Sequence, residues 1–261
     1  MRRILLIALS LLVAALAAAP LKFQQLVIND LVYDADARKL AWLCAGFFAA
    51  VLLSATLKFL LGLRQSVVGE RVVLLIRERL YGNCVADART GGEEAMQRGT
   101  LLTMLAAEAE VVGGFAGSAI ATPLVQLGTL VSVIGFIVAS QPWLGILALA
   151  VVVPQAAIVV ALQERINRRV RDRVRSLRSA SERISASDLA RIEAGVEEDF
   201  RAIFETRRRI FVLKLSSKFA LAAISAVGKV GILFLGGWLV LGGRSDVGTV
   251  VASLTGLARI E

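Results

Sequence analysis

The chain has 261 residues, of which 57% are hydrophobic and only 20% are charged, and its mean hydropathy is +0.72. A soluble domain is typically about 45–50% apolar and about 25% charged. The excess gathers in runs of about 20 residues with almost no charge, the length that a helix needs to cross a hydrocarbon core of ~30 Å. The composition therefore excludes an ordinary globular enzyme and a disordered chain.

Charge and histidine content narrow the function further. The chain has 30 Lys and Arg residues against 21 Asp and Glu, a net charge of +9, and no histidine. The cations lie between the apolar runs, which is typical of membrane-protein loops rather than of a nucleic-acid-binding surface. Without histidine, Ser-His-Asp and Cys-His catalysis and most zinc sites are excluded. We therefore expect no catalytic residue, no metal site, no nucleic-acid partner, and free thiols at Cys44 and Cys84.

In chain order, the apolar runs predict five complete membrane spans and the start of a sixth. The complete spans cover about residues 4–21, 40–63, 113–139, 142–162 and 219–242, and the sixth begins at 247–261. The last run is shorter than the ~20 residues of a complete span, so we expect that the sequence is cut off, either as a piece of a longer protein or as a truncated gene. The first run resembles a cleavable secretory signal, but Pro20 directly after Ala19 disfavours cleavage, so we expect an uncleaved first span.

Two long polar segments, 64–112 and 163–218, separate these spans. Neither contains proline, and both space their apolar residues as a helix does. Each is long enough for a helix to run out and back by roughly 30–35 Å at 1.5 Å per residue. The helical pattern breaks at Thr90–Gly92 in the first segment and at Gly195 in the second, so we expect each segment to form a helical hairpin.

The distribution of cations predicts how the bundle is oriented. Arg2 and Arg3 precede the first span, and most other Lys and Arg residues lie in 64–112 and 163–218. Because cytoplasmic loops carry the excess of cations, we expect a multi-pass protein of the plasma or inner membrane with a cytoplasmic N-terminus. All three tryptophans then fall at the outer ends of their spans, where an aromatic belt forms. The predicted fold is an all-α polytopic membrane bundle with two long cytoplasmic helical hairpins.

Three polar side chains inside the predicted spans are candidates for a substrate pathway: Lys229, Gln126 and Gln155. A cation deep inside a span, such as Lys229, costs ~2.5–3.5 kcal/mol on insertion scales and usually faces a cavity or a partner. It either contacts an acidic or polar substrate or pairs with backbone carbonyls in a solvated cleft. Gln126 and Gln155 either form interhelical hydrogen bonds, the commoner role of such residues, or contact substrate.

Small residues and prolines predict how the spans pack. Gly113 and Gly117 form a small-xxx-small pair, which is typical of close helix packing. Pro123 and Pro154 are expected to kink the third and fourth spans. The run Arg165–Arg178 is expected to be a solvated helix face and a topology signal, with binding of anionic membrane lipid as the alternative.

Three segments, in their order and spacing, resemble the transmembrane domain of a type I ABC exporter, and the resemblance covers essentially the whole chain. RQSVVGERVVLLIRERLY (64–81) resembles the segment that leads from the second span to the first coupling helix. RGTLLTMLAAEAEVV (98–112) resembles the family stretch TGELLSRLTNDVDAI. LFLGGWLVLGGRSDVGTVVASLTGLAR (233–259) is similar to the family corner WLGGRLVLAGRLTLGDLVAFLLYLGR. GNCVADARTGGEEAM (82–96) and GVEEDFRAIF (195–204) depart from the family pattern near the two coupling helices.

The resemblance implies that the chain is the membrane-spanning subunit or domain of an ATP-driven exporter, which forms the substrate translocation pathway by alternating access. The sequence has no G-x-x-x-x-G-K-[ST] phosphate loop and no LSGGQ-like signature, so we expect no ATPase activity and no cofactor in this chain. By resemblance, ATP and Mg²⁺ belong to a nucleotide-binding domain that is fused downstream or forms a separate chain. A second transmembrane domain is implied as well, in a homodimer or heterodimer.

In such a transporter, the tips of the hairpins contact the nucleotide-binding domain. The first tip is predicted near 85–92, where polar residues offer contacts. The second is predicted near 192–203, where a glycine interrupts the helical pattern and two apolar residues could fill a cleft on the partner. The candidate coupling residues are Asp87, Arg89, Gly92, Gly195, Phe200 and Ile203.

Other functions compete with this interpretation. A non-transporting membrane scaffold could dock a cytoplasmic partner through the same hairpins. A secondary transporter is disfavoured because the predicted spans contain no Asp or Glu for ion coupling. A reading frame that continues beyond the codon for Glu261 into a phosphate loop would favour the exporter over the scaffold.

Overall fold

The computed structural model describes residues 2–34, 36–90, 108–186 and 193–260. Every regular element within these ranges is helical, as predicted. Five helical segments in the described part of the chain are long and apolar enough to cross a membrane, and a shorter apolar helix follows at Val247–Ile260. The helices form two compact units: unit 1 comprises Met1–Pro142 and Leu239–Ile260, and unit 2 comprises Trp143–Trp238.

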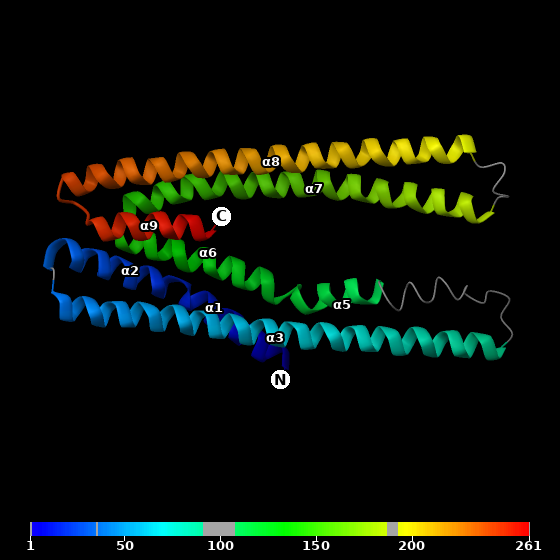
Figure 1. Ribbon diagram of the computed structural model, residues 1–261, viewed down its shortest axis with the longest axis horizontal. Coiled ribbons are helices and arrows are strands. Elements are labelled where there is room, and N and C mark those ends of the chain that lie inside the picture. Colours follow the sequence, from blue (N-terminus) through cyan, green and yellow to red (C-terminus); the bar gives the residue numbers. More distant parts are fainter. Residues whose placement is uncertain (1, 35, 91–107, 187–192, 261) are drawn as a thin grey trace. The chain divides into compact units, whose positions relative to one another are not determined.

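Unit 1 contains the first three spans and the beginning of the sixth (Figure 1). Its elements are α1 (Arg2–Ala15), the 3₁₀ turn η1 (Leu16–Ala18), α2 (Ala19–Asn29), the π-helical turn η2 (Asp30–Asp34), α3 (Ala37–Thr90), α5 (Ala109–Ser118), α6 (Ala121–Ser140) and α9 (Val247–Ile260). Within this unit, α3 packs along α5, α1 packs along α6, and α2 contacts both α3 and α9.

The first membrane-crossing segment is longer than predicted. The predicted span ends at residue 21, before several polar side chains, whereas the apolar helical segment covers Ile4–Tyr33. The polar side chains find partners: the Lys22 ammonium donates to Gln25 Oε1 at 2.9 Å, and Gln25 Nε2 donates to the Thr249 hydroxyl at 2.6 Å. Since a hydrogen-bonded polar group costs far less to bury than an unpaired one, the helix continues through these residues.

The longer first span contains a buried acidic residue near its end. Asp30 is only 3% exposed, and its carboxylate pairs with the Lys39 ammonium of α3 at 2.8 Å. We disfavoured a secondary transporter on the assumption that no span carries a buried carboxylate, and that assumption is wrong for this span. A buried carboxylate needs such a partner, so the pair also holds η2 against the start of α3.

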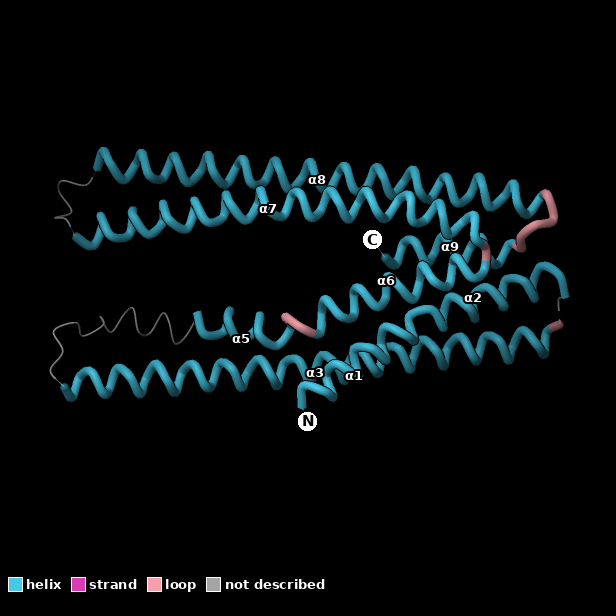
Figure 2. The backbone as a smooth tube through the Cα atoms, turned by 180° about the vertical axis from the view of Figure 1, so that it is seen from behind, coloured by secondary structure: helices cyan, strands magenta, loops and turns pink. Residues whose placement is uncertain are grey.

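The third span consists of two helices rather than one. α5 ends at Ser118 and α6 begins at Ala121, with a short turn between them (Figure 2). Pro123 explains this break, because its ring lacks an N–H and clashes with the carbonyl four residues earlier, that of Ala119. The disturbance that we expected at Pro123 is therefore confirmed.

Glycine residues bring α3 and α5 unusually close together. A Cβ atom on Gly117 would lie 2.5 Å from the Gln65 carbonyl oxygen, and one on Gly113 would lie 2.8 Å from the Gly69 carbonyl oxygen. Carbon atoms in ordinary contact are about 3.5–4.0 Å apart, so any larger residue would force the two helices apart. The predicted close packing at Gly113 and Gly117 is confirmed.

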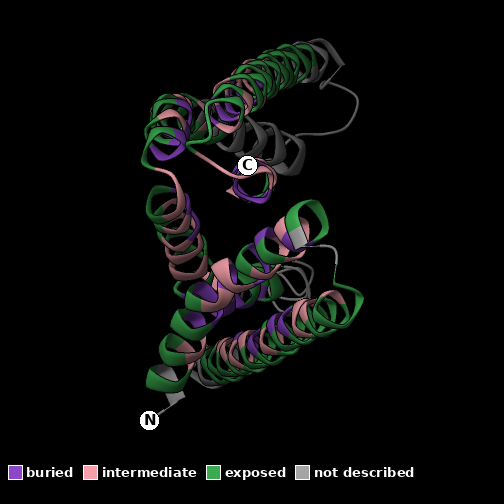
Figure 3. Cartoon of the chain, turned by 90° about the vertical axis from the view of Figure 1, so that its left-hand side faces the viewer, coloured by how far each residue is buried: buried purple, intermediate pink, exposed green. Residues whose placement is uncertain are grey.

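α9 lies against α2 and α6, and half of its residues are buried (Figure 3). A Cβ atom on Gly256 would lie between 3.0 and 3.4 Å from the side chains of Val133, Leu21 and Ile137. These three side chains and Leu257 are almost completely buried. They form an apolar core that holds the start of the sixth span inside unit 1.

Unit 2 is a hairpin of α7 (Pro142–Ala186) and α8 (Glu193–Leu241), which run side by side (Figure 1). The fourth and fifth spans are the segments Pro142–Arg168 and Phe204–Leu241 of these two helices. α7 passes through Pro154 without ending, so the predicted kink does not divide the helix. The helical hairpin predicted for the second polar segment is confirmed.

A glycine-dependent turn ends α8 and leads the chain into α9. Gly243 has a φ of 66°, and its N–H donates to the Val240 carbonyl at 3.0 Å. The Arg244 N–H donates to the Leu239 carbonyl at 2.8 Å. These two bonds form a Schellman motif, in which glycine favours the left-handed position after the helix.

Candidate functional site

A cavity in unit 1 brings together polar side chains from α3, α6 and α9. Its volume is about 330 Å³, near the lower end of the about 300–1,000 Å³ found for small-molecule sites. Its polar lining residues are Lys58, Gln65, Gln126, Thr129 and Arg259, and the others are Val13, Leu61, Gly62 and Val125. This space, defined by these nine residues, is the unit 1 cavity.

Helical spacing explains why these side chains share one space. On α3, Lys58, Leu61 and Gln65 recur at intervals of three and four residues, so they lie on one face of the helix. Val13 and Leu61 are buried in an apolar cluster, and Val125 packs against that cluster. The unit 1 cavity therefore has one apolar wall beside a set of hydrogen-bonding groups.

Arg259 reaches the unit 1 cavity from α9. Its guanidinium donates to the Ala17 carbonyl oxygen at 2.9 Å. Ala17 belongs to η1, the turn between α1 and α2, so the bond positions Arg259 against the first span. A guanidinium carries five N–H groups, and this bond uses only one of them.

Of the predicted pathway residues, Gln126 is the one that lines the unit 1 cavity. We missed Lys58 and Arg259 as site residues. The regular spacing of Lys58, Leu61 and Gln65 was a signal that could have indicated a shared polar face on α3. No sequence signal places Arg259 beside them, because it lies far along the chain and reaches the cavity only through the packing of α9.

Gln155 connects the two helices of unit 2. Its side-chain nitrogen donates to the Ser225 hydroxyl at 2.8 Å and to the Leu221 carbonyl at 3.4 Å, so it bridges α7 and α8. Ser225 is buried, and its hydroxyl is a well-placed acceptor. The interhelical interpretation of Gln155 is confirmed, and a contact with substrate stays a prediction.

Lys229 lies on α8, one turn after Ser225, and is half-buried. The neighbouring Gly231 lets α7 pack closely, since a Cβ atom there would lie 3.2 Å from the Leu147 side chain. Lys229 therefore sits on the part of α8 that pairs with α7 in unit 2, whereas Gln126 belongs to unit 1. A role for Lys229 in the substrate pathway stays a prediction.

The coupling candidates lie at the ends of the long helices. Asp87 and Arg89 belong to the last turns of α3, and Gly92 lies outside the described residues. The expected interruption at Gly195 is wrong in position, because α8 begins at Glu193 and already includes it. Phe200 and Ile203 follow in the same helix; the side chains of all these residues are outside the described ones. Their contact with a partner stays a prediction.

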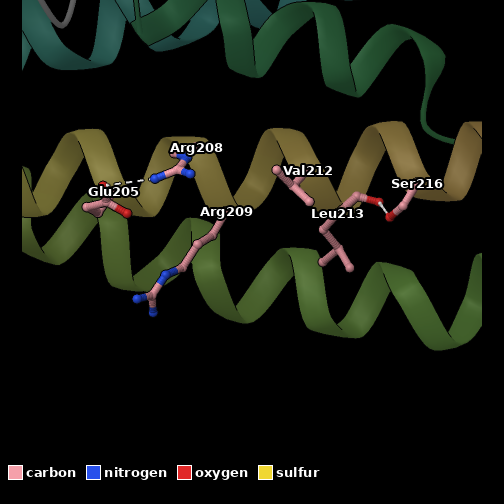
Figure 4. Close-up of a pocket in the computed structure, with 6 residues that line it drawn as sticks. All are labelled: Glu205, Arg208, Arg209, Val212, Leu213 and Ser216. Carbon is pink, nitrogen blue, oxygen red and sulfur yellow. Dashed lines mark hydrogen bonds and ion pairs between the residues drawn. The ribbon is translucent and has the colours of Figure 1, made fainter.

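An open groove runs along α8 (Figure 4). Its described lining residues all come from that one helix: Glu205, Arg208, Arg209, Val212, Leu213 and Ser216. Glu205 and Arg208 point toward one another and form an exposed ion pair of 3.5 Å, whereas Arg209 points away. An exposed pair of this kind contributes little energy, and a groove lined by one helix does not enclose a ligand. The unit 1 cavity is therefore the stronger candidate site.

A polar cluster that we did not predict fastens the start of α9 to α2. The Thr249 N–H donates to Asp246 Oδ1 at 2.6 Å, and the Gly248 N–H donates to Asn29 Oδ1 at 2.8 Å. Burial alone would raise the pKa of Asp246, but hydrogen bonds from Thr249, Asn29 and Gln25 outweigh it and lower the pKa below its usual value. Asp246 is thus the N-cap of α9, and the cluster satisfies two N–H groups that would otherwise be unpaired.

Within the described residues, no group of Cys, Asp and Glu is arranged to hold a metal ion. The family model of the ABC transporter transmembrane region matches residues 4–260, which includes all five spans and α9. A search of curated proteins found no significant match. The chain, whose described residues form a membrane bundle of helices, therefore belongs to the ABC transporter transmembrane region family, consistent with the membrane domain of a type I exporter.

Proposed function

We propose that this chain is the membrane domain of an ATP-driven exporter and that it forms the substrate pathway by alternating access. Membership of the ABC transmembrane family supports a transporter membrane domain. The observation that supports ATP-driven alternating access is the continuation of the spans into long helices. Such helices can transmit movement from a cytoplasmic ATPase to the membrane.

The helices extend far beyond the thickness of a bilayer. α3 continues from its predicted span to Thr90, α7 continues to Ala186, and α8 begins at Glu193, well before the fifth predicted span. At 1.5 Å per residue, each extension is roughly 35–40 Å long. Neither extension of the hairpin in unit 2 contains proline, so each can move as one rigid piece.

The long helices and the exposed apolar surface of the chain support two protein partners, a nucleotide-binding domain and a second transmembrane domain. A nucleotide-binding domain, fused or separate, would contact the tips through the candidate coupling residues and would itself hold ATP and Mg²⁺. A second transmembrane domain would cover part of the exposed apolar surface, on which Phe234 is 80% and Leu241 is 89% exposed. Lipid would cover the remainder. The hairpins would lie in the cytoplasm, together with the N-terminus.

Nucleotide-dependent accessibility tests the proposal directly. Thr129→Cys lines the unit 1 cavity, and Leu127→Cys lies on the same helix outside the cavity. In a background without Cys44 and Cys84, the complete transporter is trapped with ATP and vanadate and then labelled with a membrane-impermeant thiol reagent. Alternating access predicts that trapping changes the labelling rate at Thr129→Cys and leaves that at Leu127→Cys unchanged.

A scaffold gives a different result. If the chain only docks a partner, labelling at both positions is the same with and without trapped nucleotide, although the partner still copurifies. The 261-residue chain by itself is expected neither to bind nor to hydrolyse ATP, because its sequence has no phosphate loop. ATP turnover by the purified chain would contradict the assignment of the ATPase to a separate domain.

A further inference from the structure

The unit 1 cavity is lined by two cations and, among its described lining residues, by no carboxylate. Lys58 comes from α3 and Arg259 from α9, and neither forms an ion pair with another described residue. A cation within a membrane span costs ~2.5–3.5 kcal/mol on insertion scales, so it usually faces a partner or a water-filled pathway. Lys58 and Arg259 are both exposed, so an anion that entered the cavity would be attracted by both cations.

The neutral polar groups of the cavity fit the same kind of ligand. Gln65, Gln126 and Thr129 add amide and hydroxyl donors close to the two cations. Arg259 is held in place through the Ala17 carbonyl and retains further N–H groups for a ligand. Hydrogen bonds from a charged donor to an anionic oxygen are roughly twice as strong as neutral ones. The cavity therefore offers the strongest interaction to a carboxylate, sulfonate or phosphate.

An apolar part of the lining selects a second property of the ligand. Val125 lines the cavity and is only half-buried, and it packs against the buried cluster of Val13 and Leu61. A fully hydrated inorganic anion would leave Val125 in contact with water, whereas an apolar group would cover it. With a volume of about 330 Å³, the cavity has room for a small hydrocarbon or aromatic body.

We propose that the unit 1 cavity binds an organic anion with an apolar body, whose charged group contacts Lys58 and Arg259 while its apolar part lies on Val125. This substrate class rests on the proposed transport function. The same chemistry occurs in soluble amphipathic acids and in acidic phospholipids, so the test must separate these two sources.

A matched pair of probes tests the requirement for charge. The wild-type chain is placed in nanodiscs of pure phosphatidylcholine, and binding of naphthalene-2-sulfonate and of its neutral analogue naphthalene-2-sulfonamide is measured by equilibrium dialysis. We expect the sulfonate to bind at least about tenfold more tightly, the effect of losing one charge-assisted hydrogen bond. Methanesulfonate, which has the charge without the aromatic body, should bind much more weakly than either.

Matched variants test the position of the site. Lys58→Gln and Arg259→Gln should each weaken sulfonate binding about tenfold. Arg64→Gln removes the same charge from the same helix as Lys58 but lies outside the cavity, so it should change binding less than about twofold. Because Arg259 also bonds Ala17, Arg259→Lys, which keeps the charge, serves as a second variant that should retain most of the binding.

Binding by the variants and competition by lipid distinguish the possible outcomes. Loss of binding in the two cavity variants but not in Arg64→Gln supports the site; competition by phosphatidylglycerol in the disc would identify the anion as a lipid, and its absence would identify a soluble acid. Equal binding of sulfonate and sulfonamide, or equal losses in Lys58→Gln and Arg64→Gln, overturns the proposal. Binding needs no ATP, so an intact site in a protein without nucleotide-dependent labelling at Thr129→Cys would refute the transport function alone.

Discussion

Gly117→Ala tests the closest approach between two helices in unit 1. In the wild type, α5 lies so close to α3 that a Cβ atom on Gly117 would be 2.5 Å from the Gln65 carbonyl oxygen and 3.2 Å from the Gly69 amide nitrogen. Both are backbone atoms, so neither can rotate away as a side chain would. The helices must therefore separate, and the packing between α3 and α5 is lost in part.

The magnitude follows from two opposing effects. Forcing an extra methyl group into a packed interface typically costs about 1–3 kcal/mol. Alanine in place of glycine returns about 1 kcal/mol of helix propensity. We therefore expect Gly117→Ala to lower the free energy of unfolding by about 0–2 kcal/mol.

Gly114→Ala is the matched control, because it adds the same methyl group to the same helix with no atom within 4 Å of its Cβ. It should be neutral or stabilising by up to about 1 kcal/mol. The difference between the two variants cancels the propensity term and should be about 1–3 kcal/mol. Unfolding is followed by circular dichroism in dodecyl maltoside with rising SDS. Equal unfolding midpoints for the two variants would refute the close approach of α5 to α3.

Three further predictions address the cap of α9, the hairpin of unit 2 and the coupling tip. Asp246→Ala should lower the free energy of unfolding by about 0.5–2 kcal/mol at pH 7, the usual cost of losing an N-cap. Because the pKa of Asp246 is lowered in the folded state, this stabilisation is present above the unfolded pKa and lost as pH falls through the folded one, so wild type and variant should converge in denaturant titrations below pH 3.8. Ser225→Ala removes the hydroxyl that accepts the 2.8 Å hydrogen bond from Gln155, and it should lower the free energy of unfolding by about 0.5–1.5 kcal/mol. Ser216→Ala should lower it less, because the Ser216 hydroxyl bonds within its own helix. Phe200→Ala should lower substrate-stimulated ATPase and transport in the complete transporter without impairing folding; a large drop in melting temperature with coupling retained would instead make Phe200 a packing residue.

The number of spans and their helical form followed from the sequence by itself. In hydrocarbon, every backbone N–H and C=O must be bonded within the chain, so a long apolar run has almost no alternative to a helix. The start of the fourth span at Pro142 was predictable because proline fits the first turn of a helix. The closely packed pair Gly113 and Gly117 was predictable because small residues spaced four apart favour close helix packing. Pro123 predicted a kink in the third span, and the structure has a break there, because proline disturbs the interior of a helix.

Contacts between distant residues were decided only by the tertiary structure. The first span continues past residue 21 because Gln25 finds Thr249 on α9, and a partner that far along the chain determines whether a polar residue can be buried. The unit 1 cavity has the same origin, since Lys58 and Arg259 line one space only after α9 has packed against α2 and α6. Hydropathy and spacing describe each helix separately, whereas a binding site depends on which helix faces meet, and that is a property of packing.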